Sequence, residues 1–246
     1  MPEQTCARCG GTGYVIVERD GLSGANRCTC FEDHLNAQRI PRAGIPDKFV
    51  NATFENFSVG QSKALGDIRW EVKSYATQYE PDWRKPGLLI IGSPGIGKTH
   101  LAIAAFKQLL TRGFDGLFFD YQTLLDRIRA GWNKEAGVSE RQAYQTALDA
   151  PILLLDDLGS RRSIEWVEDT VTAILTDRCN RNRTLIATAN LPLQPALSGR
   201  ETPAGEPRYG KTLSEVIGLR ATSRLQEMCR IIQMPELPDY RPNIRN

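Results

Sequence analysis

One loop of the sequence combines glycines, a lysine and a threonine at the spacing that binds nucleotide phosphates. It runs Gly92, Ser93, Pro94, Gly95, Ile96, Gly97, Lys98, Thr99, a G-x4-G-K-T pattern. Glycines let the backbone turn so tightly that its N–H groups converge on phosphate oxygens, and the helix that follows adds its positive dipole end. Lys98 supplies a charge for the β- and γ-phosphates, and the Thr99 hydroxyl suits a Mg²⁺ position. We therefore expect the chain to bind a nucleoside triphosphate along this segment, His100 included.

Two carboxylates follow a second apolar run. Four consecutive apolar residues, 152–155, are typical of a central parallel strand covered on both faces, and Asp156 and Asp157 come directly after them. Ligands of open α/β sheets bind at this end of the strands. We expect Asp156 to help hold Mg²⁺ and Asp157 to orient or activate the attacking water. The alternative for Asp157 is an N-cap of the next helix.

A polar amide follows the next buried strand. Asn190 comes directly after the apolar run 184–189 and is expected level with Asp156 across the sheet. An amide there can position the nucleophilic water or sense the γ-phosphate. The alternative is that Asn190 only initiates a turn before Leu191 and Pro192.

Four of the six cysteines lie within the first thirty residues, at the spacing C-x2-C-x18-C-x-C. They are Cys6, Cys9, Cys28 and Cys30. In a chain without a secretion signal this clustering favours a metal over disulfides, and four thiolates complete the shell of a structural Zn²⁺. His34 could replace one thiol, and the other alternative is a reduced, flexible tail without metal. Cys179 and Cys229 are expected to serve packing.

The composition is that of a soluble globular protein. The 246 residues fit one main domain with a small appendage, and 41% of them are hydrophobic and 24% charged. No run approaches the ~18–20 apolar residues of a membrane span, and the N-terminus lacks a signal pattern, so we expect a cytoplasmic protein without a membrane partner. The net charge of +2 does not by itself indicate nucleic-acid binding.

The elements that must position these residues alternate between strands and helices. The expected strands are 88–91, 116–120, 152–155 and 184–189, with an N-terminal hairpin from residue 14. The expected helices are 61–79, from the phosphate loop to 110, 121–132, 141–150, 163–182 and one that resumes near 213. Residues 31–60 are expected to be a linker and an extended segment, and 191–212 a surface loop. The alternation predicts an α/β fold with a doubly wound parallel sheet.

In these motifs the sequence resembles the DnaC/IstB branch of AAA+ ATPases. The resemblance is carried by GSPGIGKTH, ILLLDDLG, TLIATANL and the late SRL, and by the cysteines with GIPDKFVNATFENF. The cysteines and the segment GIPDKFVNATFENF resemble those of replicative-helicase loaders of the DnaC/DnaI type. The resemblance implies a P-loop AAA+ core with strand order 5-1-4-3-2 in residues 46–246. Residues 1–45 would then form a zinc-binding, helicase-interacting module and linker.

The resemblance also assigns residue roles. It makes Lys98 and Thr99 the Walker A residues, Asp156 and Asp157 the Walker B acids, and Asn190 sensor 1. Arg224 matches the arginine finger that acts on a neighbouring subunit's ATP, with Arg220 as the alternative, and Arg241 resembles the sensor 2 arginine. Most AAA+ proteins have Glu where this chain has Asp157, and the shorter side chain implies slow hydrolysis suited to a switch.

The function implied is an ATPase that loads the replicative hexameric DNA helicase onto single-stranded DNA and assembles into an ATP-bridged oligomer. The candidate DNA contacts are Arg127, Arg129, Lys134, Arg161 and Arg162, with Tyr121 or Trp132 for stacking. The alternative is an IstB-like transposition helper that binds duplex DNA and a transposase, but such helpers usually lack the cysteine cluster. A third possibility is a nucleotide switch with negligible turnover.

Overall fold

The protein is described from a computed structural model that covers residues 6–19, 22–131, 138–161, 164–193, 197–201, 207–209 and 211–240. Its centre is a five-stranded parallel sheet in the order β4-β5-β6-β3-β9. The strands are β3 (Gly87–Ile91), β4 (Gly116–Asp120), β5 (Ile152–Leu158), β6 (Thr184–Ala189) and β9 (Cys229–Gln233). Counted from the strand before the phosphate loop, this is the expected order 5-1-4-3-2, which is therefore confirmed.

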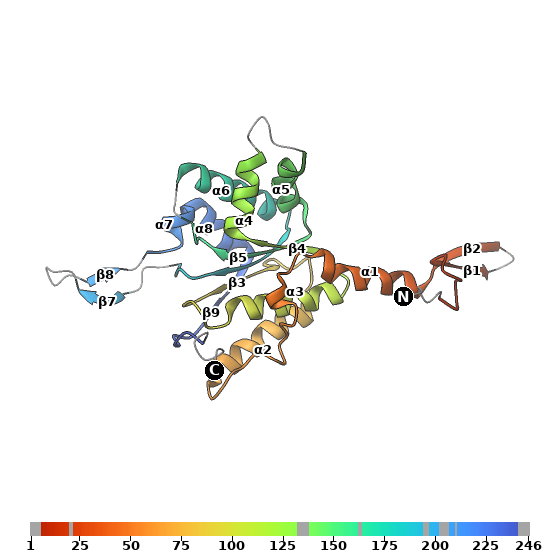
Figure 1. Cartoon of the computed structure of the whole chain (residues 1–246), viewed down its shortest axis with the longest axis horizontal. Helices are drawn as coiled ribbons and strands as arrows, with labels where there is room; N and C mark the ends of the chain where they lie inside the picture. Colours follow the sequence, from red (N-terminus) through yellow and green to blue (C-terminus); the bar gives the residue numbers. More distant parts are fainter. Residues whose placement is uncertain are drawn as a thin grey trace.

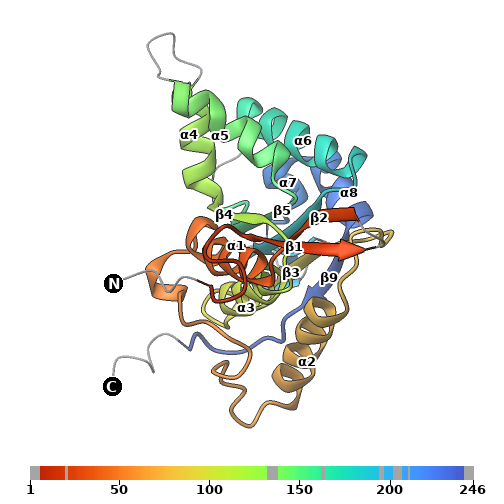
Figure 2. The same ribbon diagram turned by 90° about the vertical axis from the view of Figure 1, so that its right-hand side faces the viewer.

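Helices cover both faces of the sheet, which explains why β3 and the first four residues of β5 are apolar. Leu88 and Ile90 of β3 pack with α2 (Lys63–Gln78) and α3 (Lys98–Thr111). Leu89 and Ile91 alternate to the other face, where α4 to α8 lie. These helices are α4 (Tyr121–Gly131), α5 (Val138–Asp149), α6 (Glu165–Asn180), α7 (Ser214–Ile217) and α8 (Leu219–Met228). Figure 1 shows the two helical layers, and Figure 2 shows them from the side of the N-terminal hairpin.

The N-terminal part is more ordered than the sequence predicts. Strands β1 (Tyr14–Arg19) and β2 (Leu22–Arg27) form the expected antiparallel hairpin. The linker expected from residue 31 is wrong over its first part, because α1 (Thr29–Arg42) is a helix with Pro41 in its last turn. A short 3-10 turn, η1 (Asp47–Phe49), follows.

The end of α1 is attached to the edge of the sheet. Ala43 is buried, and its carbonyl accepts a hydrogen bond from Phe118 N of β4 at 2.7 Å. Arg39 pairs with Asp115, just before the same strand, at 2.8 Å. The hairpin and α1 therefore project from the β4 edge (Figure 1).

Two further expectations need correction. The surface loop expected at 191–212 contains an antiparallel hairpin, β7 (Leu197–Glu201) and β8 (Pro207–Tyr209). The helix expected to resume near 213 is divided into α7 and α8, because Gly218 adopts φ 86° and ψ 153°. Among the described helices, none is both long and apolar enough to cross a membrane.

Candidate nucleotide-binding site

The phosphate loop connects the buried strand β3 to the first turn of α3. Gly97 has φ 93°, and a Cβ at this position would lie 2.5 Å from a ring atom of Phe57, so the turn needs a glycine for conformation and for space. Lys98 is buried and donates from Nζ to the carbonyl of Ser93 at 2.7 Å. This contact holds Lys98 beside the phosphate loop. The lysine and the backbone of the loop are expected to bind phosphate together.

The two acidic residues and the expected polar partners converge at the ends of the strands. Thr99 Oγ1 donates to Asp156 Oδ1 at 2.8 Å, and Thr188 Oγ1 donates to the same oxygen at 2.6 Å. Asn190 Nδ2 donates to Asp157 Oδ1. The structure thus brings together the residues expected for Mg²⁺, for the attacking water and for sensing the γ-phosphate.

A β-bulge explains how consecutive acids reach one cavity. In a regular strand neighbouring side chains point to opposite faces. Here the pairing of β5 with β6 shifts between Leu155 and Leu158, and Asp157 has φ 59° in the left-handed region. Both Asp156 and Asp157 consequently line the same cavity. Asp157 does not act as the N-cap of α6, whose N-cap is Ile164.

The carboxyl group of Asp157 has a raised pKa. Burial is the largest cause, the charge of Asp156 adds to it and Asp120 contributes further, while Lys98 opposes the shift. The charges of Asp156 and Asp157 repel each other. A divalent cation bound between the two carboxylates would offset this repulsion, and carboxylate oxygens are suitable ligands for such a cation.

The cavity has a volume of about 900 Å³, enough for a nucleotide. Its floor is the phosphate loop with the two acids and Asn190. Parts of its wall lie outside the phosphate loop, the two acids and Asn190: Thr188 with Asp120, residues 48–49 and 56–62, and residues 237–240. The only local signal for Thr188 is its place two residues before Asn190.

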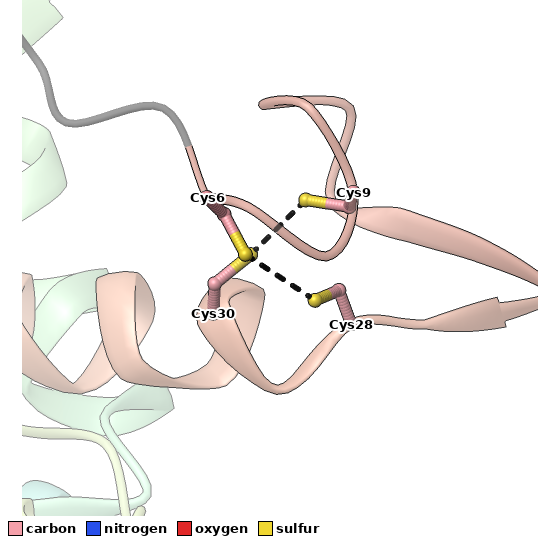
Figure 3. Close-up of side chains that lie close together, drawn as sticks. All are labelled: Cys6, Cys9, Cys28 and Cys30. Atoms are coloured by element: carbon pink, nitrogen blue, oxygen red, sulfur yellow. Dashed lines mark hydrogen bonds between the residues drawn. The ribbon is translucent and has the colours of Figure 1, made fainter.

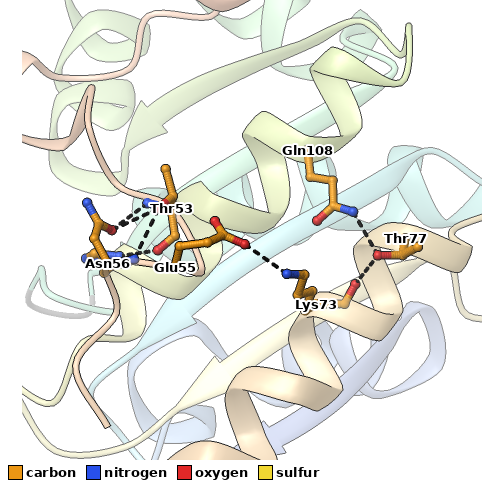
Figure 4. Close-up of polar contacts among 7 residues, drawn as sticks. Thr53, Glu55, Asn56, Lys73, Thr77 and Gln108 are labelled. Carbon is orange, nitrogen blue, oxygen red and sulfur yellow. Dashed lines mark hydrogen bonds and ion pairs between the residues drawn. The ribbon is translucent and has the colours of Figure 1, made fainter.

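Residues 51–57, of which Asn56 and Phe57 line the cavity, form a folded turn (Figure 4). Asn56 accepts from the Thr53 N–H at 2.9 Å, and Glu55 pairs with Lys73 of α2 at 2.8 Å. The Thr53 carbonyl contacts His100 Nε2 at 2.7 Å. His100 therefore contributes to the cavity partly by holding this wall.

The other wall is the chain that follows β9. Met234 N donates to Ile91 O at 2.7 Å, and Tyr240 N donates to Gly95 O at 3.1 Å. Asp239 lies against the phosphate loop so closely that a Cβ on Gly95 would be 1.8 Å from its Oδ1. Arg241, the expected sensor 2 residue, lies outside the described residues.

The four N-terminal cysteines form a cluster compatible with metal binding (Figure 3). The four Sγ atoms of Cys6, Cys9, Cys28 and Cys30 lie within 4.8 Å of one another, with Cys9 to Cys30 at 3.3 Å. A tetrahedral Zn²⁺ with Zn–S bonds of about 2.3 Å separates its sulfurs by about 3.8 Å. The hydrogen bond between Cys9 and Cys30 lowers the pKa of Cys9 to about 6 and raises that of Cys30, because the two thiols share one proton between them. The side chain of His34 lies outside the described residues.

The arginine expected to act as a finger lies away from this cavity. Arg224 is on α8, half-exposed, and forms an ion pair with Glu227 one turn later. Arg220 is exposed on the same helix. Neither lines the cavity as far as the chain is described, so neither serves the nucleotide of its own subunit in this arrangement.

The expected DNA contacts divide into several groups. The expectation that Tyr121 stacks on a base is wrong, because its side chain is buried in the core beside the sheet and only 1% exposed. Arg161 is ion-paired with Asp126, Arg127 lies over the ring of Phe119, and Arg129 is exposed on α4. Trp132, Lys134 and Arg162 lie outside the described residues. Cys229 is buried, which confirms its packing role.

Comparison with known proteins identifies similar chains. The model of the family described as IstB-like ATP binding protein matches residues 51–196, more than half of the chain. The replicative helicase loader DnaC of Escherichia coli (strain K12) is 26% identical over 179 residues, which cover 70% of each chain. The phage-like element PBSX protein XkdC of Bacillus subtilis (strain 168) is 25% identical over 209 residues, 77% of this chain and 73% of that one.

Solved structures with the same fold include those of the DnaC helicase loader and of DnaI. The crystal structure of the DnaC helicase loader superposes with a TM-score of 0.62 at 27% identity, over 77% of this chain and 100% of that chain. The crystal structure of the DnaI superposes with a TM-score of 0.56 at 23% identity, over 79% and 93% of the respective chains, and shows the fold alone.

Proposed function

Since the chain belongs to the IstB-like ATP binding protein family, we propose that it is an ATP-dependent loader of a replicative DNA helicase. The observation that carries the ATP-dependent part is the convergence of the phosphate loop, both acids and Asn190 on one cavity of about 900 Å³. The loader part is supported by the similarity to the E. coli protein named replicative helicase loader DnaC. The solved DnaC structure supports it through the same fold over its whole length.

The chemistry proposed for the cavity is binding and slow hydrolysis of ATP. Lys98 and the loop backbone hold the phosphates, while Thr99 and Asp156 would hold Mg²⁺, which neutralises phosphate charge when bound. Asp157 and Asn190, hydrogen-bonded to each other, orient the attacking water. Asp157 reaches one methylene less far than a glutamate, which supports a switch with slow turnover.

Completion of the site by a second subunit is part of the proposal. Arg224 does not line its own cavity but is half-exposed on α8, where a neighbouring chain could use it. A finger supplied in trans stabilises charge on the γ-phosphoryl group in the transition state. ATP would then lie between subunits, and an isolated chain would hydrolyse it poorly.

The division of labour proposed along the chain has its boundary near residue 45. Residues 1–45 would bind Zn²⁺ through the four cysteines and capture the helicase, and residues 46–246 would form the ATPase. The close sulfur cluster and its projection from the sheet edge support this division. Arg127, Arg129 and Arg161 remain candidates for contacts with single-stranded DNA, in a cytoplasmic protein.

Co-elution of the purified chain with its host's replicative hexameric helicase, with and without ATP, tests the loader function. We expect a stable complex that Cys6→Ser/Cys9→Ser abolishes and that Cys179→Ser, a cysteine outside the cluster, retains. No complex under any nucleotide condition would refute the loader function. Tight binding to duplex DNA would then favour the IstB-like transposition helper, and full loading by Lys98→Ala would favour a switch without turnover.

A further inference from the structure

A buried threonine occupies the point where the two acidic residues leave the regular sheet. Thr188 is 1% exposed and lies on β6. The pairing of β5 with β6 joins Leu155 to Ala187 and resumes with Leu158 opposite Ala189. Thr188 is thus the residue of β6 that faces the bulge formed by Asp156 and Asp157.

The hydroxyl of Thr188 makes two contacts that the bulge would otherwise lose. It donates to Asp156 Oδ1 at 2.6 Å and accepts the backbone N–H of Asp157 at 2.9 Å. The shift in pairing takes that N–H out of the ladder, and a buried N–H without a partner is costly. One side chain therefore satisfies the backbone of one acid and orients the carboxylate of the other.

The other hydroxyl that donates to Asp156, that of Thr99, has a second expected role. Thr99 also donates to Asp156 Oδ1, at 2.8 Å, but its oxygen is expected to be a Mg²⁺ ligand. Thr188 lies one strand away on β6 and forms no part of the phosphate loop. It is suited to hold Asp156 in place whether or not a metal is present.

We propose that Thr188 is a positioning residue that fixes Asp156 for Mg²⁺ and Asp157 for the attacking water through its one hydroxyl. The proposal rests on the nucleotide-binding part of the proposed function and is independent of the helicase. Groups that orient metal ligands typically contribute 10- to 100-fold to metal affinity. The hydroxyl, rather than the shape of the side chain, carries the effect.

The test compares Thr188→Val, which keeps the shape and removes the hydroxyl, with Thr188→Ser, which keeps the hydroxyl. Binding of a fluorescent ATP analogue is measured in EDTA and across a Mg²⁺ titration, and turnover and thermal unfolding are measured in parallel. Thr170→Val is the matched control, because Thr170 is also buried but donates to the Trp166 carbonyl of its own helix, away from the acids. If Thr188→Val does not fold, Thr188→Ala replaces it.

For Thr188→Val we expect nucleotide binding in EDTA within about two-fold of wild type, and a Mg²⁺ half-saturation raised about 10-fold or more. Thr188→Ser and Thr170→Val should titrate like wild type. A Thr188→Val protein with the wild-type Mg²⁺ dependence would overturn the proposal, as would a serine variant as impaired as the valine variant. A wild-type chain that binds no nucleotide would instead refute the ATP-binding function itself.

Discussion

Arg178 is a fully buried arginine that connects α6 to the end of α5 and to the start of β6. Its guanidinium donates from α6 to backbone carbonyls, among them those of Ala147 and Ala150, each at 2.8 Å. It also donates to the carbonyl of Thr184, the first residue of β6. Burial lowers its pKa to about 9, so the side chain remains charged at neutral pH.

The magnitude of its contribution follows from these contacts. Arg178→Met leaves the three close carbonyls unpaired, each at a cost of about 1–3 kcal/mol, and removes the desolvation cost of the guanidinium, which is several kcal/mol. We expect a net loss of about 3 kcal/mol in the free energy of unfolding. With an m-value of about 3 kcal/mol/M in urea, the midpoint should fall by about 1 M.

Urea unfolding followed by circular dichroism measures this shift. The matched control is Arg181→Met, because Arg181 lies one turn further along, is about half-exposed, and pairs with Asp149 and Asp177 at 3.3 and 3.1 Å. Exposed ion pairs contribute about 0–1 kcal/mol, so this variant should unfold close to wild type. Equal shifts for the two variants would refute the argument from buried carbonyls.

Three further outcomes are expected. Elemental analysis should find about one Zn²⁺ per chain, and Cys9→Ser should lose it without lowering the melting temperature of the ATPase core; retained metal would contradict a site built from the four cysteines. Gly97→Ala should weaken ATP binding at least about 10-fold in a fluorescence titration, because its Cβ meets Phe57 at 2.5 Å and φ is 93°; wild-type affinity would contradict this. Arg224→Ala should bind ATP but turn over about 100-fold more slowly, and mixing it with Lys98→Ala should restore turnover. No recovery on mixing would contradict a finger supplied in trans.

Most of the fold could be predicted from local patterns in the sequence. The apolar runs at β3, β5 and β6 are uniform because both faces of these strands are buried, so strands of this sheet could be predicted from their composition. The phosphate loop is a local motif and is recognisable from its residues alone. The order of the strands came from the resemblance, because periodicity does not specify which strands pair.

The features that could not be predicted depend on which strand residues pair and on which face of a helix is buried. Thr188 acquires its role from a shift in strand pairing, which leaves no local mark in the sequence. The sequence offers Tyr121 for stacking because helical spacing does not say that its ring faces the core. Pro41 and Gly44 predict a break in the segment that forms α1, whereas in the structure they lie at the end of this helix.

Strand β4 joins two ends of the molecule that the proposed function assigns to different tasks. Phe118 N bonds the residue that follows α1, and Asp120, two residues later, lines the nucleotide cavity. Two residues of strand span about 7 Å. The end of α1 and the wall of the cavity are thus attached to the same short strand, with the hydrogen bond between Phe118 and Ala43 as the point of attachment for α1. The chain path from the end of α1 to the wall of the candidate nucleotide cavity therefore crosses one hydrogen bond and two residues of β4.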